Sequence, residues 1–184
     1  MPKVSEEHAE TRRRQVLDGA RRAFARHGYE GATVARLEEE IGLSRGAIFN
    51  YFENKWALFY ALAEEDYSRA SEIWRRDGLG PLLRHVTTES PDWLGVYLEL
   101  LRMLRNDPRL REQWSRRDPE GDAELGALLA DMQSRGELRR DIGVEQIGLF
   151  VGLVIDGVVV HAATGFPVDV ESVLQLVVSA IGPQ

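Results

Sequence analysis

Side chains suited to binding nucleic acid are concentrated between Ser44 and Lys55, in the sequence SRGAIFNYFENK. Arg45 can donate two hydrogen bonds to a guanine or bind a phosphate, and the amide of Asn50 can pair with adenine or with a phosphate. The hydroxyls of Ser44 and Tyr51 and the ammonium of Lys55 suit phosphate oxygens. These groups could bind a DNA surface if one helix presents them together.

Two short helices joined by a sharp turn are predicted to position these groups. Thr33 has the side chain of an N-cap, and the helix that follows it buries one apolar stripe, formed by Val34, Leu37 and Ile41. Gly42 permits the left-handed backbone that a sharp turn requires, and Ser44 caps the next helix. The arrangement predicts a helix-turn-helix.

The second helix of such a unit enters the DNA major groove with its N-terminal residues facing base edges. Gly46 and Ala47 are small enough for close approach, whereas Ile48 and Phe52 are expected to face inward. The backbone amides at both helix N-termini can also bind phosphates. Helix-turn-helix geometry occurs in proteins that never bind DNA as well, so spacing alone leaves an all-helical protein–protein adaptor open.

The rest of the chain shows helical periodicity and no sustained strand alternation, so the expected fold is all-α. We expect an N-terminal three-helix DNA-binding domain over residues 1–53 and a helical ligand-binding and dimerisation domain over residues 54–184. The helices are expected at 6–27, 34–41, from Ser44, 55–76, 81–89, 91–106, from Pro108, 123–135, 144–164 and 169–181.

Composition excludes several classes of protein. The chain has no cysteine, which excludes disulfides, thiolate metal sites and cysteine nucleophiles. The N-terminus begins with charged residues, so a cytoplasmic location is expected. The apolar run at 147–163 is shorter than the ~20 residues of a membrane span and is interrupted by Asp156 and His161, which favours a buried helix and no membrane contact.

The net charge of −7 is unevenly distributed. Residues 1–60 contain ten basic and nine acidic residues, and the remainder contains thirteen and twenty-one. The acidic part is therefore expected to avoid nucleic acid, while the N-terminal part could bind it if its cations share a face.

No catalytic or metal site is predicted. His8, His27, His85 and His161 are scattered, with no pair four residues apart. Asp156 and His161 are five residues apart, on different sides of a helix, which disfavours a small helical enzyme built on them.

Residues 12–59, RRRQVLDGARRAFARHGYEGATVARLEEEIGLSRGAIFNYFENKWALF, resemble the N-terminal domain of the TetR family of bacterial transcriptional regulators. GELRRDIGVEQ and the Asp156–Gly157 pair resemble the family's penultimate helix more weakly. The resemblance implies phosphate and base contacts at Thr33, Ser44, Arg45, Gly46, Ala47, Phe49, Asn50, Tyr51 and Lys55. Phe49 departs from the tyrosine usual in the family, which puts its phosphate contact in doubt.

The family resemblance implies a dimeric regulator that responds to a ligand and binds a palindromic operator. Because most members of the family are repressors, it also implies a repressor. The helices at 144–164 and 169–181 could form the dimer interface, although they could also pack only within one subunit. The residues expected in that interface are Leu149, Leu153, Val160, Leu174, Val177 and Ile181.

The helices from about 55 to 140 are expected to surround a cavity for a small-molecule effector. Trp93, Tyr97, Leu100, Leu101 and Leu104 share a helical face and could line it or form ordinary core. Arg102 and Arg105, with Trp114, could bind an anionic metabolite, although Arg102 could equally pair with Glu99 on the surface. No resident cofactor is expected. GATVARLEEEIGLSRGAIF is also similar to the actinobacterial aconitase repressors, which implies citrate, with magnesium, as the effector.

Overall fold

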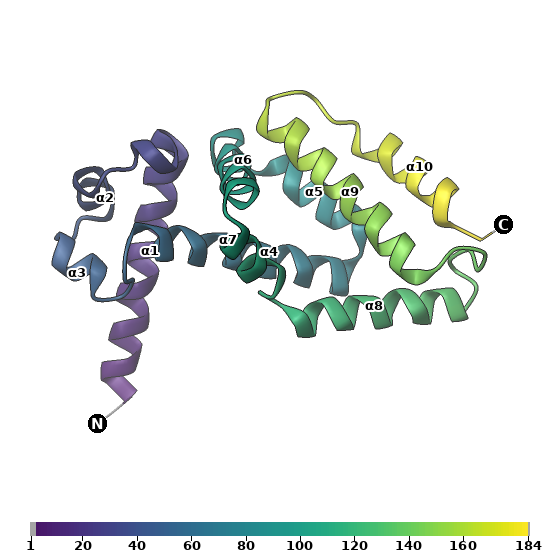
Figure 1. The fold of residues 1–184 in the computed structure, drawn as a ribbon, viewed down its shortest axis with the longest axis horizontal. Helices are drawn as coiled ribbons and strands as arrows, with labels where there is room; N and C mark the ends of the chain where they lie inside the picture. The colour runs from purple at the N-terminus through teal and green to yellow at the C-terminus, as the bar shows by residue number, and fades with distance from the viewer. Residues whose placement is uncertain (1–2, 184) are drawn as a thin grey trace.

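The computed structural model describes residues 3–183, and within them the chain forms ten α-helices and no strand (Figure 1). The predicted all-α fold is confirmed. The helices are α1 (Lys3–Gly31), α2 (Val34–Ile41), α3 (Arg45–Phe49), α4 (Lys55–Asp77), α5 (Leu79–Thr88), α6 (Pro91–Asn106), α7 (Pro108–Ser115), α8 (Pro119–Ser134), α9 (Val144–Ala163) and α10 (Val170–Ile181).

The predicted capping of the helix-turn-helix is confirmed. The Thr33 hydroxyl accepts a hydrogen bond from the Arg36 backbone N–H at 3.4 Å, and the Ser44 hydroxyl accepts one from the Ala47 N–H at 3.4 Å. Gly42 has φ +74°, a left-handed backbone that glycine adopts without the steric cost of a Cβ. These local interactions fix where α2 ends and α3 begins.

Several helix boundaries differ from the prediction, and the differences are largest at the end of α1 and at the start of α8. Helix α1 passes through a kink at Gly28 (φ +66°), directly after the predicted end at residue 27, and continues to Gly31. Helix α8 begins four residues before the predicted start, because the Asp118 carboxylate accepts a hydrogen bond from the Gly121 N–H at 3.0 Å and caps it there.

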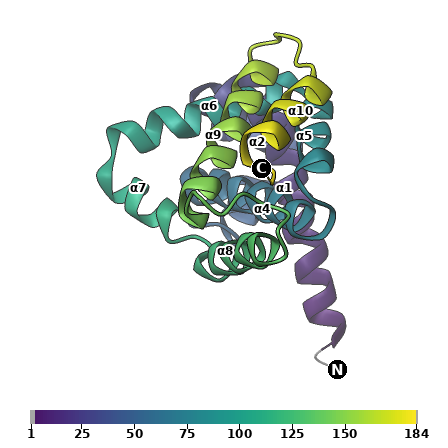
Figure 2. The ribbon, with the colours of Figure 1, turned by 90° about the vertical axis from the view of Figure 1, so that its right-hand side faces the viewer.

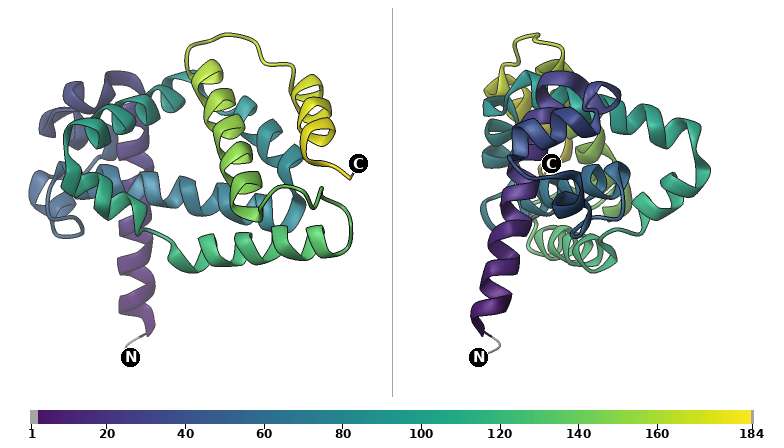
Figure 3. Two further views of the ribbon diagram at one scale, coloured as in Figure 1. Left: turned by 45° about the vertical axis from the view of Figure 1, so that its right-hand side comes forward. Right: turned by 90° about the vertical axis from the view of Figure 1, so that its left-hand side faces the viewer.

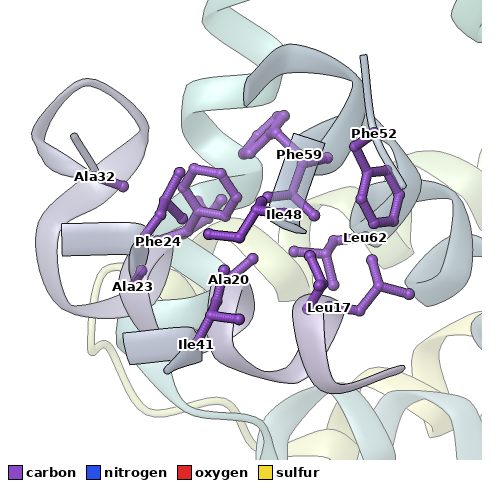
Figure 4. Packing of buried hydrophobic residues seen from close by; sticks show 14 of the residues in the cluster. Leu17, Ala20, Ala23, Phe24, Ala32, Ile41, Ile48, Phe52, Phe59 and Leu62 are labelled. Atoms are coloured by element: carbon purple, nitrogen blue, oxygen red, sulfur yellow. The ribbon is translucent and has the colours of Figure 1, made fainter. Parts of the chain in front are cut away.

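The first hydrophobic core joins the helix-turn-helix to the rest of the chain. Figure 4 shows Phe24, Ile48 and Phe59 packed together, and Ile48 and Phe52 are buried as the sequence predicted. The same cluster includes Leu100 of α6, so α6 packs directly on the DNA-binding helices. The predicted boundary at residues 53 and 54 lies between α3 and α4, in chain order, and stays a prediction.

Helices α5, α8, α9 and α10 form a second group beside this core, with their own hydrophobic clusters. Helix α4 runs from α3 towards the end of the molecule where α8, α9 and α10 lie, and α9 lies between α6 and α10 (Figure 1). Helices α6 and α7 stand out from the body on one side (Figure 2), and the N-terminal half of α1 projects away from both groups (Figure 3).

Helix α9 is buried on one side only. By length and composition alone it is apolar enough to cross a membrane, but 22% of its apolar window is buried. Ile147 and Val151 lie in the core, whereas Leu149 and Leu153 are 66% and 62% exposed. The expectation of a buried helix is therefore correct for one face of α9 and wrong for the other.

Candidate nucleic-acid interface and effector cavity

Helix α3 presents a compact polar surface. Arg45, Gly46 and Asn50 are exposed, Ala47 is half-buried, and Tyr51 follows directly with 37% of its surface exposed. The Arg45 backbone N–H is bound by the Glu38 carboxylate at 2.6 Å, which anchors the start of α3. Among the side chains that the structure describes, that of Arg45 forms no ion pair. Its guanidinium is available to an external anion or base.

Phe49 packs against the first hydrophobic core and is only half-buried. A phenyl ring suits this place because its apolar surface is removed from water on the core side. The DNA contact at this position stays a prediction, and it cannot use a hydroxyl.

Lys55 lies at the start of α4, where its ammonium donates to the Tyr29 carbonyl at 2.8 Å and lies 4.4 Å from the centre of the Tyr29 ring. Tyr29 in turn donates its backbone N–H to the Glu99 carboxylate of α6 at 2.5 Å. A chain of contacts therefore joins α6, the end of α1 and the start of α4. An ammonium has three donors, so Lys55 can keep this bond and still bind a phosphate.

A cavity of about 550 Å³ lies among helices α4 to α9. Of the residues proposed from the sequence, Trp93, Tyr97, Leu100, Leu101, Leu104 and Trp114 lie in its lining. Arg102 and Arg105 do not: both are exposed on the other side of α6. Their proposed role in the cavity is therefore wrong.

The cavity wall carries acidic groups that are already hydrogen-bonded. The Asp66 carboxylate accepts two bonds from Arg21, at 2.7 and 2.9 Å, and one from the Trp93 indole at 2.7 Å. The Tyr97 hydroxyl donates to Asp156 at 3.4 Å, and burial, helped by Asp156, raises the pKa of Tyr97 to about 12. Tyr97 therefore stays neutral at physiological pH.

Arg117 is a cavity residue that the sequence reasoning missed. Its guanidinium lies 3.5 Å from the centre of the Tyr67 ring and 4.5 Å from that of Trp114, and one amino group donates to the Trp114 carbonyl at 2.7 Å. Its Nε is buried and bonded to no group in the described part of the chain. Only the charge and position of Arg117 in the RRDP sequence, just before α8, could have drawn attention to it.

No three acidic or histidine side chains converge as a metal site within the part of the chain that the structure describes. Magnesium, which the resemblance implied with citrate, would therefore have to keep most of its ligands from the effector and water, as Mg²⁺ commonly does. Asp156 lines the cavity, whereas His161 is exposed and packs beside Phe166.

The residues predicted for a dimer face divide into exposed side chains and side chains packed inside the subunit, and the interface itself stays a prediction. Leu149, Leu153 and Val160 are exposed on α9 and available to a partner. Leu174 packs in the subunit's own core, and Val177 and Ile181 are 4% and 9% exposed within it. The prediction that Leu174, Val177 and Ile181 face a partner is therefore wrong, because they pack inside the subunit. The exposed apolar side chains that the prediction omitted are Phe150, Phe166, Leu176 and Val178.

Comparisons with known proteins agree with this geometry. Residues 16–62 match the model of bacterial regulatory proteins of the tetR family, and residues 82–182 match that of the BetI-type transcriptional repressor C-terminal domain. The chain is 43% identical over 184 residues to the HTH-type transcriptional repressor Rv1474c of Mycobacterium tuberculosis, with 98% of each chain covered. The chain belongs to the TetR family. The resemblance of residues 12–59 to that family is thereby confirmed.

A second relative is also a transcriptional repressor. The HTH-type transcriptional repressor AcnR of Corynebacterium diphtheriae is 41% identical over 184 residues, with 98% of this chain and 97% of that one covered. The solved structure of Salmonella enterica GusR has a similar fold, with a TM-score of 0.74, 22% identity, and coverage of 92% and 94%. As a TetR-family member, the protein is a DNA-binding transcriptional regulator rather than an enzyme.

Proposed function

We propose that the protein is a cytoplasmic repressor that binds a palindromic operator as a homodimer and is modulated by a small molecule in the α4–α9 cavity. The observation that carries the proposal is α3, which is capped, anchored on the core by Ile48, and exposes Arg45 and Asn50 together. Such a helix fits the major groove, where arginine and asparagine read base edges. The adaptor alternative leaves this polar surface without a function.

Dimerisation supplies the second recognition helix. One such helix reads only a few base pairs, so two are needed at a spacing of one DNA turn, ~34–36 Å. The exposed leucines of α9 and the exposed Leu176 and Val178 of α10 support a helical interface between two copies. Burial of these side chains would remove an apolar surface that water otherwise contacts.

Helix α6 can transmit the state of the cavity to the DNA-binding helices. One face of α6 carries Tyr97 and Leu101 in the cavity wall, and another holds the Tyr29 N–H through Glu99. An effector that favours one position of α6 would thereby favour one position of Tyr29 and Lys55. A typical coupling of 1–3 kcal/mol would change operator affinity about 5- to 150-fold.

Two kinds of effector are considered. Citrate with magnesium is the candidate that follows from the resemblance to aconitase repressors. The mostly apolar lining of the cavity favours a less charged ligand with an apolar body.

Fluorescence anisotropy tests the proposal with DNA from upstream of the protein's own gene and of an aconitase gene, against scrambled competitor over a salt series. We expect competitor-resistant binding that weakens steeply with salt. Arg45→Ala should weaken it by roughly 1–3 kcal/mol for each half-site, whereas Lys55→Ala, which takes a cation away from a phosphate, should also lower the salt dependence. Arg116→Ala is the matched control, because Arg116 is exposed after α7 and pairs with Glu112.

Either of two results would contradict the proposal. Equal, weak binding to operator and scrambled DNA would favour the adaptor. If Arg45→Ala and Lys55→Ala both bound DNA as tightly as Arg116→Ala does, the docking of α3 would be wrong.

A further inference from the structure

We propose that the effector is an amphipathic monocarboxylate whose carboxylate binds Arg117 and whose apolar body fills the cavity among α4 to α9. The inference rests on the proposed function, in which this cavity is the effector site. It names the chemistry of the ligand, and it differs from the tricarboxylate implied by resemblance.

The size and the wall of the cavity fit an apolar body. About 550 Å³ lies within the range of 300–1,000 Å³ typical of sites for small organic ligands. Most of the wall is aliphatic or aromatic; besides the α6 residues, it includes Phe59, Trp74, Leu82, Val86, Ile155 and Val159. A highly charged ligand would lose its hydration here without equivalent polar partners.

Acidic groups in the wall argue against several negative charges on the ligand. Asp66, Glu89 and Asp156 all line the cavity. Asp66 is neutralised by Arg21, and Glu89 lies 3.5 Å from His85. Asp156 receives only the Tyr97 hydroxyl among its described contacts. A tricarboxylate would bring its second and third charges towards these carboxylates.

Arg117 is an arginine in the wall that forms no ion pair with the acidic side chains that the structure describes. Arg69, the other arginine there, lies 3.8 Å from Glu65, whereas no acidic oxygen of the described residues lies within 4.0 Å of the Arg117 nitrogens. The rings of Tyr67 and Trp114 attract the guanidinium but cannot accept its N–H bonds as a carboxylate would. With one amino group held by the Trp114 carbonyl, the other remains for a ligand oxygen.

The side from which the ligand approaches Arg117 follows from charge. Arg117 also borders a smaller hollow lined by Glu64 and Asp118. Burial raises the pKa of the Glu64 carboxyl, and the charge of Arg117 opposes that rise, so Glu64 is close enough to interact with the guanidinium. An anion in the hollow would meet two acidic side chains. The large cavity also has acidic groups in its wall, but Asp66 there is paired with Arg21 and Glu89 lies beside His85, whereas Glu64 in the hollow already interacts with Arg117 itself. A carboxylate therefore gains most from Arg117 on the side of the large cavity.

The test uses the full-length protein and three probes with the same alkyl chain: octanoate, 1-octanol and octylamine, together with citrate with and without Mg²⁺. Binding is followed by tryptophan fluorescence, because Trp74, Trp93 and Trp114 line the cavity, and by calorimetry. We expect octanoate to bind about tenfold or more tightly than octanol, as a charge-assisted arginine–carboxylate bond predicts, and more tightly than citrate.

The variants separate the anchor from the cavity. Arg117→Gln should abolish the preference of the protein for octanoate over octanol, Arg117→Lys should keep part of it, and Arg116→Gln, the exposed neighbour, should keep all of it. Binding of 1-octanol by Arg117→Gln shows that its cavity is intact. If Arg117→Gln does not fold, Arg117→Lys still tests the anchor, because its preference for octanoate over octanol should be weaker than that of the wild type.

The proposal is wrong if wild-type protein binds octanoate no more tightly than octanol, if citrate or octylamine binds more tightly than octanoate, or if Arg117→Gln keeps the preference. DNA anisotropy of the same samples without probe keeps this result separate from the proposed function. A failed anchor with intact operator binding would refute the ligand class alone, whereas absent operator binding would refute the repressor.

Discussion

Replacing Gly28 and Glu99, singly and together, tests the connection between α6 and the DNA-binding helices. Gly28 has φ +66°, and a Cβ at this position would lie 2.6 Å from Oε1 of Glu99. The other oxygen, Oε2, accepts the Tyr29 N–H at 2.5 Å. In Gly28→Ala the carboxylate must therefore rotate away, so that this single substitution both strains the backbone and removes the hydrogen bond.

The expected free energies follow from these two effects. A hydrogen bond to a charged group contributes about 1.5–3 kcal/mol, and a left-handed alanine costs roughly 1–2 kcal/mol. Glu99→Ala should then lower the free energy of unfolding by about 1.5–3 kcal/mol, and Gly28→Ala by about 2.5–5 kcal/mol. The double variant should resemble Gly28→Ala, because the bond is removed only once. The coupling energy should be about 1.5–3 kcal/mol.

Urea unfolding at one fixed protein concentration, followed by tryptophan fluorescence, measures all four free energies of unfolding. Gly136→Ala is the matched control, since Gly136 has φ +77° and a Cβ there would meet nothing within 4 Å, so it reports backbone strain alone. Additivity of Gly28→Ala and Glu99→Ala within about 0.5 kcal/mol would refute the bond and, with it, the path through α6.

Three further substitutions or conditions have defined outcomes. The folded state raises the pKa of Tyr60 and of Tyr97 to about 12. Each tyrosine therefore stabilises the fold fully below pH ~10 and loses that contribution as the pH rises towards 12. Alkaline unfolding followed by tyrosine absorbance measures this loss. Gly19→Ala would place a Cβ 2.6 Å from the Cα of Ile41, so overpacking of α1 on α2 should cost roughly 1–3 kcal/mol in thermal unfolding, and an unchanged melting temperature would contradict this packing. Leu153→Glu puts a charge on the exposed face of α9 and should give monomers in sedimentation and weaker operator binding; a stable dimer would exclude this face as the interface.

The helix-turn-helix was predictable because its signals are local. Thr33 and Ser44 cap helices through backbone groups three residues away, and Gly42 supplies its own left-handed turn. Such interactions depend little on the rest of the fold. The same holds for the inward orientation of Ile48, which follows from helical periodicity within one short segment.

The dimer face was only partly predictable because α10 is apolar on more than one side. Val177 is buried and its neighbours Leu176 and Val178 are 71% and 65% exposed, so three consecutive apolar residues face different surroundings. Periodicity identifies an apolar stripe but does not say which neighbouring helix covers it. That choice depends on how α10 packs against α5 and α9, which is a tertiary property.

The basic residues proposed for the cavity and the one found there differ in how far the sequence could predict them. Arg102 and Arg105 each follow a cavity-lining leucine by one residue, and one residue turns an α-helix by about 100°, which takes both side chains to the exposed side of α6. Helical phase alone could have excluded them. Arg117 is different, because it follows α7, which brings Trp114 and then Arg117 against Tyr67 of α4, fifty residues earlier in the chain. No local pattern specifies that meeting, so the sign of the charge offered to an effector is decided by tertiary packing.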